Sequence, residues 1–205
     1  MINFANHKKE TLKELLLDDC SQFIEESCEL FYRGITTHIN DYEIFIPPKN
    51  RTPKNTDNDS HKLLNDFSLE KIGFPARSGV FTTKDSDNAE IYTESETGEV
   101  IGDVCIFLPM NGYKYAYIPG VDDLTNHLSP VSSFHLWKIN KNLSLSEEEE
   151  YQIYKKEKED IIKGFVEKYK TTNLKDTGNE EVSFICDGYY LIAMKYKNVV
   201  EELIT

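Results

Sequence analysis

The alternation of apolar and polar positions along the chain predicts two long amphipathic helices. Residues 8–28 carry apolar side chains at spacings of three and four, which is typical of a helix that packs one face against a core. A second helix is expected over 147–170. It is preceded by Ser146, which forms the S-x-x-E signature of a capping box with Glu149. The acidic residues in its first turn suit the helix dipole and are therefore not interpreted as a metal site.

Apolar and aromatic runs between and after these helices predict short strands. The expected strands cover residues 30–35, 42–46, 77–83, 101–108, 113–118, 132–139, 181–186 and 189–196. Asp187-Gly188, between the last two runs, is typical of a tight hairpin turn. Shorter helices are expected over 61–70 (capped by Ser60), 87–93 and part of 119–128. This mixture indicates an α+β fold.

Length and composition limit the domain count and the kind of partner. The 205 residues are expected to form one domain, with residues 1–28 as an N-terminal packing helix and residues 29–196 as the core. A formal charge of -13 argues against broad nucleic-acid binding. No run suits a signal peptide or a membrane span, so a cytoplasmic location is expected. No metal site is expected, because no C-x-x-C pair occurs among the four cysteines, which we interpret as buried free thiols: Cys20, Cys28, Cys105 and Cys186.

Arg33 is unusual because it lies inside an apolar run. A guanidinium group is always charged, so this side chain should face a cleft or pair with an anion, unless it reaches water from an edge strand. The polar, proline-broken loop at residues 49–60 is long enough to be functional. Within and after it, Arg51, Asp57 and His61 are candidate ligand contacts, although a solvated surface loop is the simpler interpretation of each one alone.

Three short motifs follow one another in a specific order. Phe31-Tyr32-Arg33-Gly34 forms the first strand, Phe81-Thr82-Thr83 forms a later one and is followed by Ala89 and Tyr92, and Asn179-Glu180-Glu181-Val182 opens the last pair of strands. In this order they resemble the mono-ADP-ribosyltransferases of the arginine–serine–glutamate class. No G-x-G-x-x-G or P-loop motif is present, so a Rossmann or NTPase fold has no support.

The resemblance implies a split β-sheet, made of two small packed sheets, with an N-terminal helix and a long helix before the last hairpin. It implies that NAD is the substrate, that Arg33 grips its phosphates, and that Thr82 occupies the place of the first motif serine at the nicotinamide pocket. Glu181 would bind the nicotinamide ribose and stabilise the positive charge that develops on it. The implied NAD-binding residues are Arg33, Gly34, Phe81, Thr82, Thr83, Tyr92, Arg51 and Arg77.

Two positions depart from the family pattern. Threonines replace serines at Thr82-Thr83, which keeps the hydroxyl groups. Asn179 occupies the acceptor-positioning place, where arginine-modifying members have a glutamate. This departure leaves open transfer to another acceptor, hydrolysis of NAD, or loss of catalysis.

The same segments are similar to uncharacterised proteins of T-even-like phages. The counterparts here are Tyr32-Arg33-Gly34, the loop Arg51–Thr56, Arg77-Ser78, and the segment from Tyr115 to Leu124. This resemblance implies a phage-encoded transferase that modifies a host protein or nucleic acid in the host cytoplasm, either packaged in the virion or made after infection. The alternatives are a catalytically idle protein of the same fold that engages a host defence protein or a nucleotide, and a structural virion component. The sequence does not fix the oligomeric state.

Overall fold

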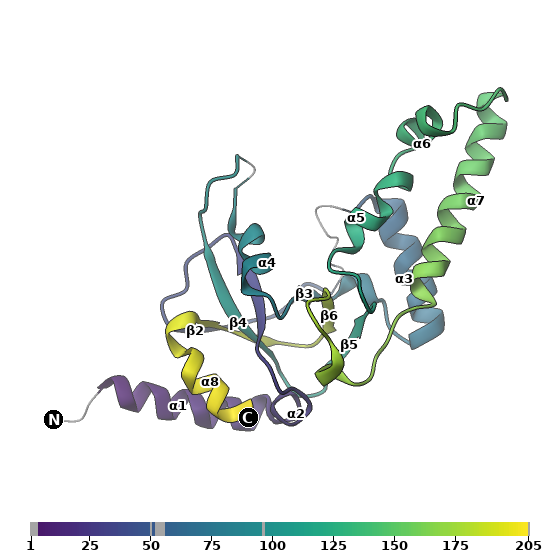
Figure 1. Cartoon of the computed structure of the whole chain (residues 1–205). Helices are drawn as coiled ribbons and strands as arrows, with labels where there is room; N and C mark the ends of the chain where they lie inside the picture. Colours follow the sequence, from purple (N-terminus) through teal and green to yellow (C-terminus); the bar gives the residue numbers. More distant parts are fainter. Residues whose placement is uncertain (1–3, 50, 52–55, 96, 205) are drawn as a thin grey trace.

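The computed structural model describes residues 4–49, 51, 56–95 and 97–204. Its short strands form two antiparallel sheets with helices on two sides (Figure 1). The α+β class predicted from the apolar pattern is therefore confirmed. Single 3-10 turns connect several elements: η1 (Ala76–Ser78), η2 (Ile91–Thr93), η3 (Ser129–Val131), η4 (Leu174–Asp176) and η5 (Met194–Tyr196).

The larger sheet has the strand order β1-β4-β7-β2, and all neighbours are antiparallel. Its strands are β1 (Phe31–Ile35), β2 (Tyr42–Phe45), β4 (Asp103–Pro109) and β7 (Tyr189–Ala193). Arg33 lies in the middle of β1, opposite Cys105 of β4. The predicted arginine-bearing strand therefore exists, and Arg33 is half-buried between two buried neighbours.

The smaller sheet has the order β3-β6-β5 and is joined to the larger one by a backbone bridge between Tyr32 and Thr83. Its strands are β3 (Val80–Thr82), β5 (Lys114–Tyr117) and β6 (Val182–Ile185). Tyr32 and Thr83 exchange two backbone hydrogen bonds, of 2.7 and 3.1 Å, across the junction. This junction brings Arg33 next to strand β3.

The predicted hairpin between the last two strands is wrong. β6 is the central strand of the smaller sheet, whereas β7 is an inner strand of the larger one. The Asp187-Gly188 turn thus carries the chain from one sheet to the other, and the Gly188 carbonyl accepts a hydrogen bond of 3.0 Å from the Met110 amide. Both runs are largely buried and pair on both edges, which a two-stranded hairpin could not provide.

The expected N-terminal helix is two helices, α1 (Phe4–Asp19) and α2 (Ser21–Glu26), separated at Cys20. Asn111, from the turn after β4, satisfies backbone groups at this break. Its amide nitrogens donate to the carbonyls of Asp18 and Asp19, and its side-chain oxygen accepts from Gln22, at 2.7–2.9 Å. Apolar spacing alone could not reveal a break that a distant turn stabilises.

The chain end forms a further helix, α8 (Lys197–Ile204), which extends the core past the predicted limit at residue 196. It lies near α1 below the sheets, and Lys13 forms a 2.6 Å ion pair with Glu202. Cys28 follows the end of α2 and is exposed, contrary to the prediction of a buried thiol, whereas Cys20 and Cys105 are buried and Cys186 is partly buried.

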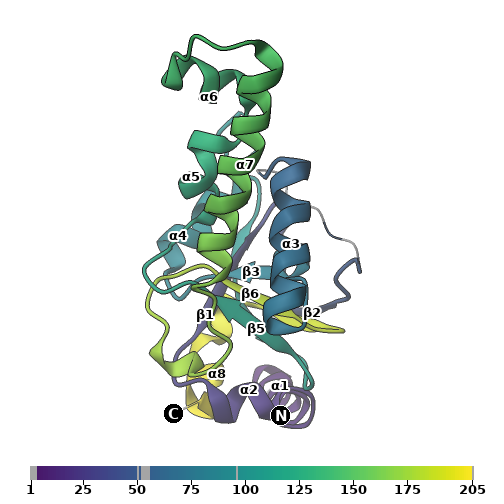
Figure 2. The same ribbon diagram turned by 90° about the vertical axis from the view of Figure 1, so that its right-hand side faces the viewer.

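A separate group of helices stands on the other side of the smaller sheet (Figure 2). It contains α3 (Asn58–Ile72), α5 (Leu124–Leu128), α6 (Phe134–Lys141) and α7 (Glu147–Val166), while the short α4 (Ser86–Glu90) lies near β1. A second apolar core, which includes Leu64, Leu124 and Ile162, joins α3, α5 and α7. The side chain of Lys158 on α7 is almost buried and pairs with Asp57 before α3 at 2.7 Å.

Two helix starts differ in how well the sequence predicted them. The capping box of α7 is present: the Ser146 side chain accepts the Glu149 backbone amide, and the Glu149 side chain accepts the Ser146 backbone amide. Helix α3 begins earlier than predicted, because Asp57 and not Ser60 is the N-cap and accepts the Ser60 amide at 2.9 Å. The strand expected at 132–139 is wrong, since this segment forms α6.

In α6, Phe134 and Trp137 lie three residues apart and both pack against Tyr154 of α7. The indole nitrogen of Trp137 donates to Glu157 at 3.0 Å. Residues 134–141 look apolar enough for a strand, but the helix places both aromatic rings on the face that packs against α7.

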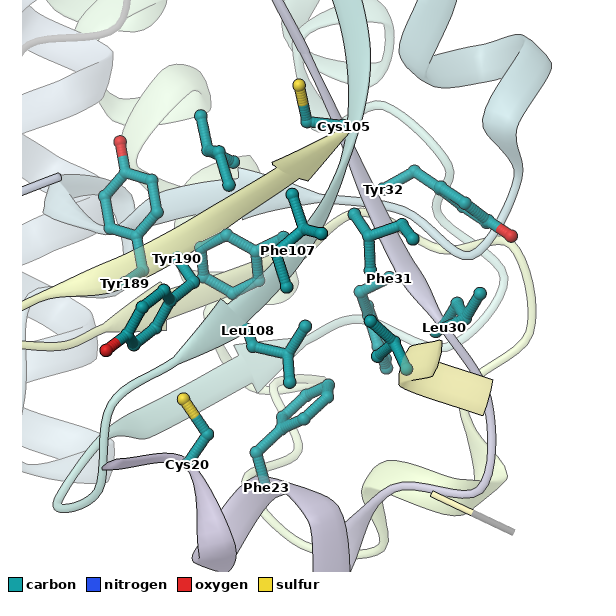
Figure 3. Close-up of a cluster of buried hydrophobic side chains, with 14 of the residues drawn as sticks. Cys20, Phe23, Leu30, Phe31, Tyr32, Cys105, Phe107, Leu108, Tyr189 and Tyr190 are labelled. Carbon is teal, nitrogen blue, oxygen red and sulfur yellow. The ribbon is translucent and has the colours of Figure 1, made fainter. Parts of the chain in front are cut away.

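The main core lies between the sheets and the N-terminal helices (Figure 3). Phe31 of β1 meets Phe184 of β6 edge-on, with ring centroids 5.6 Å apart, and Phe23 of α2 lies 5.7 Å from Phe31. Edge-to-face contacts at this spacing stabilise aromatic clusters beyond their buried area. The cluster thus fixes the two strands that bring Arg33 and Glu181 together.

Candidate functional site

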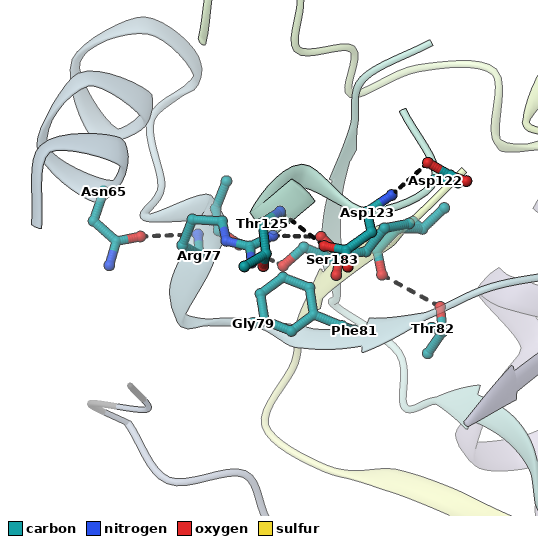
Figure 4. A network of polar contacts seen from close by, with 12 residues as sticks. Asn65, Arg77, Gly79, Phe81, Thr82, Asp122, Asp123, Thr125 and Ser183 are labelled. Carbon is teal, nitrogen blue, oxygen red and sulfur yellow. Dashed lines mark hydrogen bonds and ion pairs between the residues drawn. The ribbon is translucent and has the colours of Figure 1, made fainter. Parts of the chain in front are cut away.

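The candidate site surrounds Phe81, in the short strand β3. Three guanidinium groups, from Arg33, Arg51 and Arg77, contact this residue or the backbone next to it, and Glu181 lies beside them. They come from β1, the loop before α3, and the turn η1. Figure 4 shows Arg77 above the Phe81 ring. Residues expected to bind NAD are thus gathered from segments far apart in the sequence.

Arg33 approaches Phe81 from the larger sheet. Its Nη1 donates to the Phe81 carbonyl at 2.8 Å, and its guanidinium lies close enough to the side chain of Tyr189 for the two to interact electrostatically. Burial lowers the pKa of Arg33, and Tyr189 offsets only part of this effect. Its Nε is buried and has no acceptor among the described residues.

Arg51 and Arg77 lie over the Phe81 ring, with their guanidinium carbons 4.9 and 4.1 Å from its centroid. Arg51 donates to the carbonyl of Gly79. Arg77 is 3% exposed and forms an ion pair with Glu181. The attraction between a cation and an aromatic face is stronger where water is excluded, as it is around Arg77.

The cluster carries more positive than negative charge. Burial, and next the charges of Arg33 and Arg77, lower the pKa of Arg51 to about 10. Burial lowers the pKa of Arg77, but the charge of Glu181 and its hydrogen bond, together with smaller effects of Tyr169 and Asp123, outweigh burial and raise the pKa. Arg33 and Arg51 have no carboxylate within an ion-pair distance among the described residues. In a chain of formal charge -13, this local excess suits an anionic ligand.

Glu181 directly precedes β6 and is only 14% exposed at its side chain. Its backbone amide donates to Val121 at 3.2 Å, which anchors it beside the start of α5. Burial, and next the charges of Glu181 and Asp123, raise the pKa of Tyr92 to about 12. Glu181 therefore lies within electrostatic range of both the arginine cluster and Tyr92.

Thr82 does not face this cluster, and the hydroxyl of Thr83 is bonded to the backbone. In the antiparallel pair of β3 and β6, Phe81 is opposite Ser183 and Thr82 is opposite Val182, so Thr82 and Phe81 point to opposite faces. The Thr82 hydroxyl donates to the Val182 carbonyl and is buried (Figure 4). The Thr83 hydroxyl donates to the Asn179 carbonyl. Both hydroxyl groups thus bond backbone groups, and neither has a hydrogen bond to the Glu181 side chain among the described residues.

Gly34 has a packing role. A side chain there would collide with the carbonyl oxygen of Ala89 and touch Tyr92. The glycine lets α4 and η2 lie directly on β1, which sets the position of Tyr92 at the rim of the site, where it is 48% exposed. The atoms nearest to a side chain at this position belong to Ala89 and Tyr92.

Asn179 is exposed and lies 3.5 Å from Asp85, the N-cap of α4. Two further candidates from the sequence, the Arg51–Thr56 motif and Asp57, add little to the site. Residues 52–55 of the Arg51–Thr56 motif lie outside the described residues, and Asp57 contacts Lys158 and not the arginine cluster.

Sequence reasoning missed three polar contributors. Asn65 accepts the Arg77 backbone amide at 2.8 Å, Ser183 donates to the Ala76 carbonyl, and Tyr189 interacts electrostatically with Arg33. The i, i+4 spacing of His61 and Asn65 on α3 was a usable signal, because it places both side chains on one helix face. Nothing local in the sequence pairs Ser183 with η1.

Comparisons with known protein families, curated proteins and solved structures found no match to this chain. Within the described ranges, no helix combines the length and apolar character needed to cross a membrane.

Proposed function

We propose that the chain is a NAD-dependent mono-ADP-ribosyltransferase. The observation that carries this proposal is the convergence of Arg33, Arg51 and Arg77 on Phe81, with Glu181 as the nearby carboxylate. A dinucleotide pyrophosphate carries two negative charges, and guanidinium groups match its geometry through paired hydrogen bonds. The excess of cations over carboxylates at the cluster equals what such a ligand would neutralise.

The arrangement of the sheets supports the same proposal. Arg33 lies on a strand of one sheet and Glu181 at the start of a strand of the other, and the sheets join at Tyr32 and Thr83. This is the layout expected of an ADP-ribosyltransferase-like split sheet. A ligand spanning the junction would contact both residues.

Each residue then has a defined role. NAD supplies a ribose bond whose cleavage develops positive charge on the ribose. Glu181, held by Arg77 through one oxygen, would stabilise that charge with its carboxylate. Phe81 and Tyr92 would offer aromatic surfaces to the nicotinamide ring. Arg33 and Arg51, together with the N–H groups of Arg77 that do not bond Glu181, would hold the phosphates.

The proposal extends to the partner and the setting. A host protein or nucleic acid is the proposed acceptor, and the host cytoplasm the proposed location, as expected of a phage-encoded enzyme. The acidic surface charge favours a protein acceptor over a nucleic acid.

The test is the release of nicotinamide from NAD by the purified full chain. Glu181→Gln should lower the rate by a factor of about 100 or more, the size of effect seen when a group that stabilises transition-state charge is removed. Glu180→Gln is the matched control, because the neighbouring Glu180 accepts the Gly120 amide and not Arg77. Equal rates in the wild type and Glu181→Gln would remove Glu181 from the mechanism.

A second function is favoured by two features of the site. The Arg77 ion pair occupies Glu181, and the Thr82 hydroxyl faces away from it, as expected of a catalytically idle protein that binds a nucleotide and engages a host protein. Binding of NAD measured by calorimetry without any nicotinamide release would favour this second function.

A further inference from the structure

The orientation of Asn65 on α3 is determined by its neighbours. Its Oδ1 accepts the backbone amide of Arg77 at 2.8 Å, and a backbone amide can only donate. Its Nδ2 therefore points the other way, toward the Ser78 hydroxyl at 3.0 Å and His61 Nε2 at 3.1 Å. Figure 4 shows the bond from Asn65 to Arg77.

This orientation fixes the tautomer of His61. The Asn65 side-chain nitrogen is an NH2 group, which can only donate hydrogen bonds. Nε2 of His61 must therefore be the acceptor and is unprotonated. The proton of the neutral ring is then on Nδ1. Burial, and next the charges of Arg77 and Arg51, lower the pKa of His61, which agrees with a neutral ring.

The Nδ1–H group of His61 is buried and has no acceptor among the described residues. The same holds for Nε of Arg33 and Nε of Arg77. A buried donor without an acceptor lowers the stability of the fold by about 1–3 kcal/mol. Three such donors in the residues around Phe81 are therefore unusual. Together they indicate a site built for a ligand that brings several acceptor oxygens.

We propose that His61 donates its Nδ1–H to a phosphate oxygen that Arg51 and Arg77 also hold. This inference rests on the proposed function and adds to it a neutral fourth donor for the pyrophosphate. The ligand must be anionic, because guanidinium groups crowd the same space. A neutral imidazole adds a directed hydrogen bond without adding a further positive charge to groups that already repel one another.

Two substitutions separate this role from a structural one. His61→Gln keeps an oxygen that accepts from Asn65 and removes the donor at the Nδ1 position. His61→Asn keeps an amide donor near the Nδ1 position and loses the contact to Asn65. His135→Gln, at an exposed position of α6, is the control.

Calorimetry with inorganic pyrophosphate and with NAD measures the effect on the full chain. We expect His61→Gln to weaken pyrophosphate binding by a factor of about 10–100, the loss expected for a hydrogen bond to a charged group. His61→Asn should retain most of the affinity, and His135→Gln all of it. If His61→Gln binds pyrophosphate as the wild type does, or if His61→Asn loses as much as His61→Gln, His61 is not a ligand contact.

The same binding experiments separate this inference from the proposed enzyme activity. A wild type that binds neither pyrophosphate nor NAD would overturn both. Pyrophosphate binding that depends on the His61 donor, without nicotinamide release, would support the inference and reject the enzyme.

Nitrogen-15 NMR of the histidine rings in the wild type needs no substitution. We expect the His61 proton on Nδ1, and a shift of the Nδ1 signal when pyrophosphate is added. A proton on Nε2, or an unchanged signal at saturating pyrophosphate, would overturn the proposal.

Discussion

Arg77 and Glu181 form an ion pair whose side chains are 4% and 14% exposed, although 104 positions separate the two residues in the sequence. The pair connects η1 to the start of β6, and the Arg77 guanidinium also packs against the face of the Phe81 ring. It is therefore both a structural contact of the smaller sheet and the part of the site nearest to the proposed chemistry.

Removing one member of this pair should be costly. Arg77→Met is expected to lower the free energy of unfolding by about 3–5 kcal/mol, because Glu181 would remain buried and unpaired. The double variant Arg77→Met with Glu181→Leu should recover much of the loss, since no uncompensated charge remains. Urea denaturation of the wild type, of Arg77→Met, of Glu181→Leu and of the double variant measures the coupling. Additive effects would show that the two side chains act independently.

Arg51→Gln should separate stability from ligand binding. Without a ligand, the substitution is expected to be neutral or to stabilise the fold slightly, because it relieves repulsion from Arg33 and Arg77. The increase in Tm caused by pyrophosphate should shrink, because one of its cations is lost. Thermal denaturation with and without pyrophosphate tests both effects. A variant less stable than the wild type that keeps the full pyrophosphate shift would contradict the prediction.

Gly34→Ala should destabilise the fold by about 1–3 kcal/mol, because the new methyl group would meet the Ala89 carbonyl and force α4 away from β1. The control is Gly164→Ala in α7, where an added side chain meets nothing within 4 Å. Replacing this helical glycine should stabilise the protein by about 0.5–1 kcal/mol. Urea denaturation should therefore give shifts of opposite sign, and equal shifts would contradict the packing role of Gly34.

Stability should depend on pH through His61. Its pKa is lowered in the folded protein, so the unfolded chain takes up a proton first as the pH falls through about 6.5. The free energy of unfolding should decrease from there down to the folded pKa and should not change through His61 above this window. The charged groups that face the ring are Arg51 and Arg77.

Urea denaturation of the wild type and of His61→Gln between pH 7 and pH 5 measures this dependence. The slope should be smaller in the variant. Asp41 and Asp57 do not obscure it, because their pKa values are lowered from 3.8 and their effects begin only near or below that pH. The same slope in both proteins would contradict the prediction.

The parts of the fold that depend on local chemistry could be predicted from the sequence. The capping box at Ser146 and the strand containing Arg33 are examples, because each is determined by neighbouring residues. The Asp187-Gly188 turn was identified, but its role was not, because turn chemistry shows that the chain reverses and not which strand it then joins.

The candidate site could be predicted in part for the same reason. Arg33 carries charge inside an apolar run, which makes it conspicuous in the sequence, whereas Arg77 and Glu181 were expected only from the resemblance of short motifs. The direction of Thr82 depends on the register between β3 and β6, and the ion pair of Arg77 depends on how η1 packs against β6. Neither relation leaves a local signal.

Two backbone hydrogen bonds between Tyr32 and Thr83 join the sheets, and hydrogen exchange at these two amides can monitor the junction. Arg33 follows one of these residues and Phe81 lies two positions before the other, so the spacing of the ligand-facing groups depends on this junction. A ligand that contacts groups on both sheets would stabilise the junction. Slower amide exchange at Tyr32 and Thr83 would then report occupancy of the site, even for a ligand that undergoes no reaction.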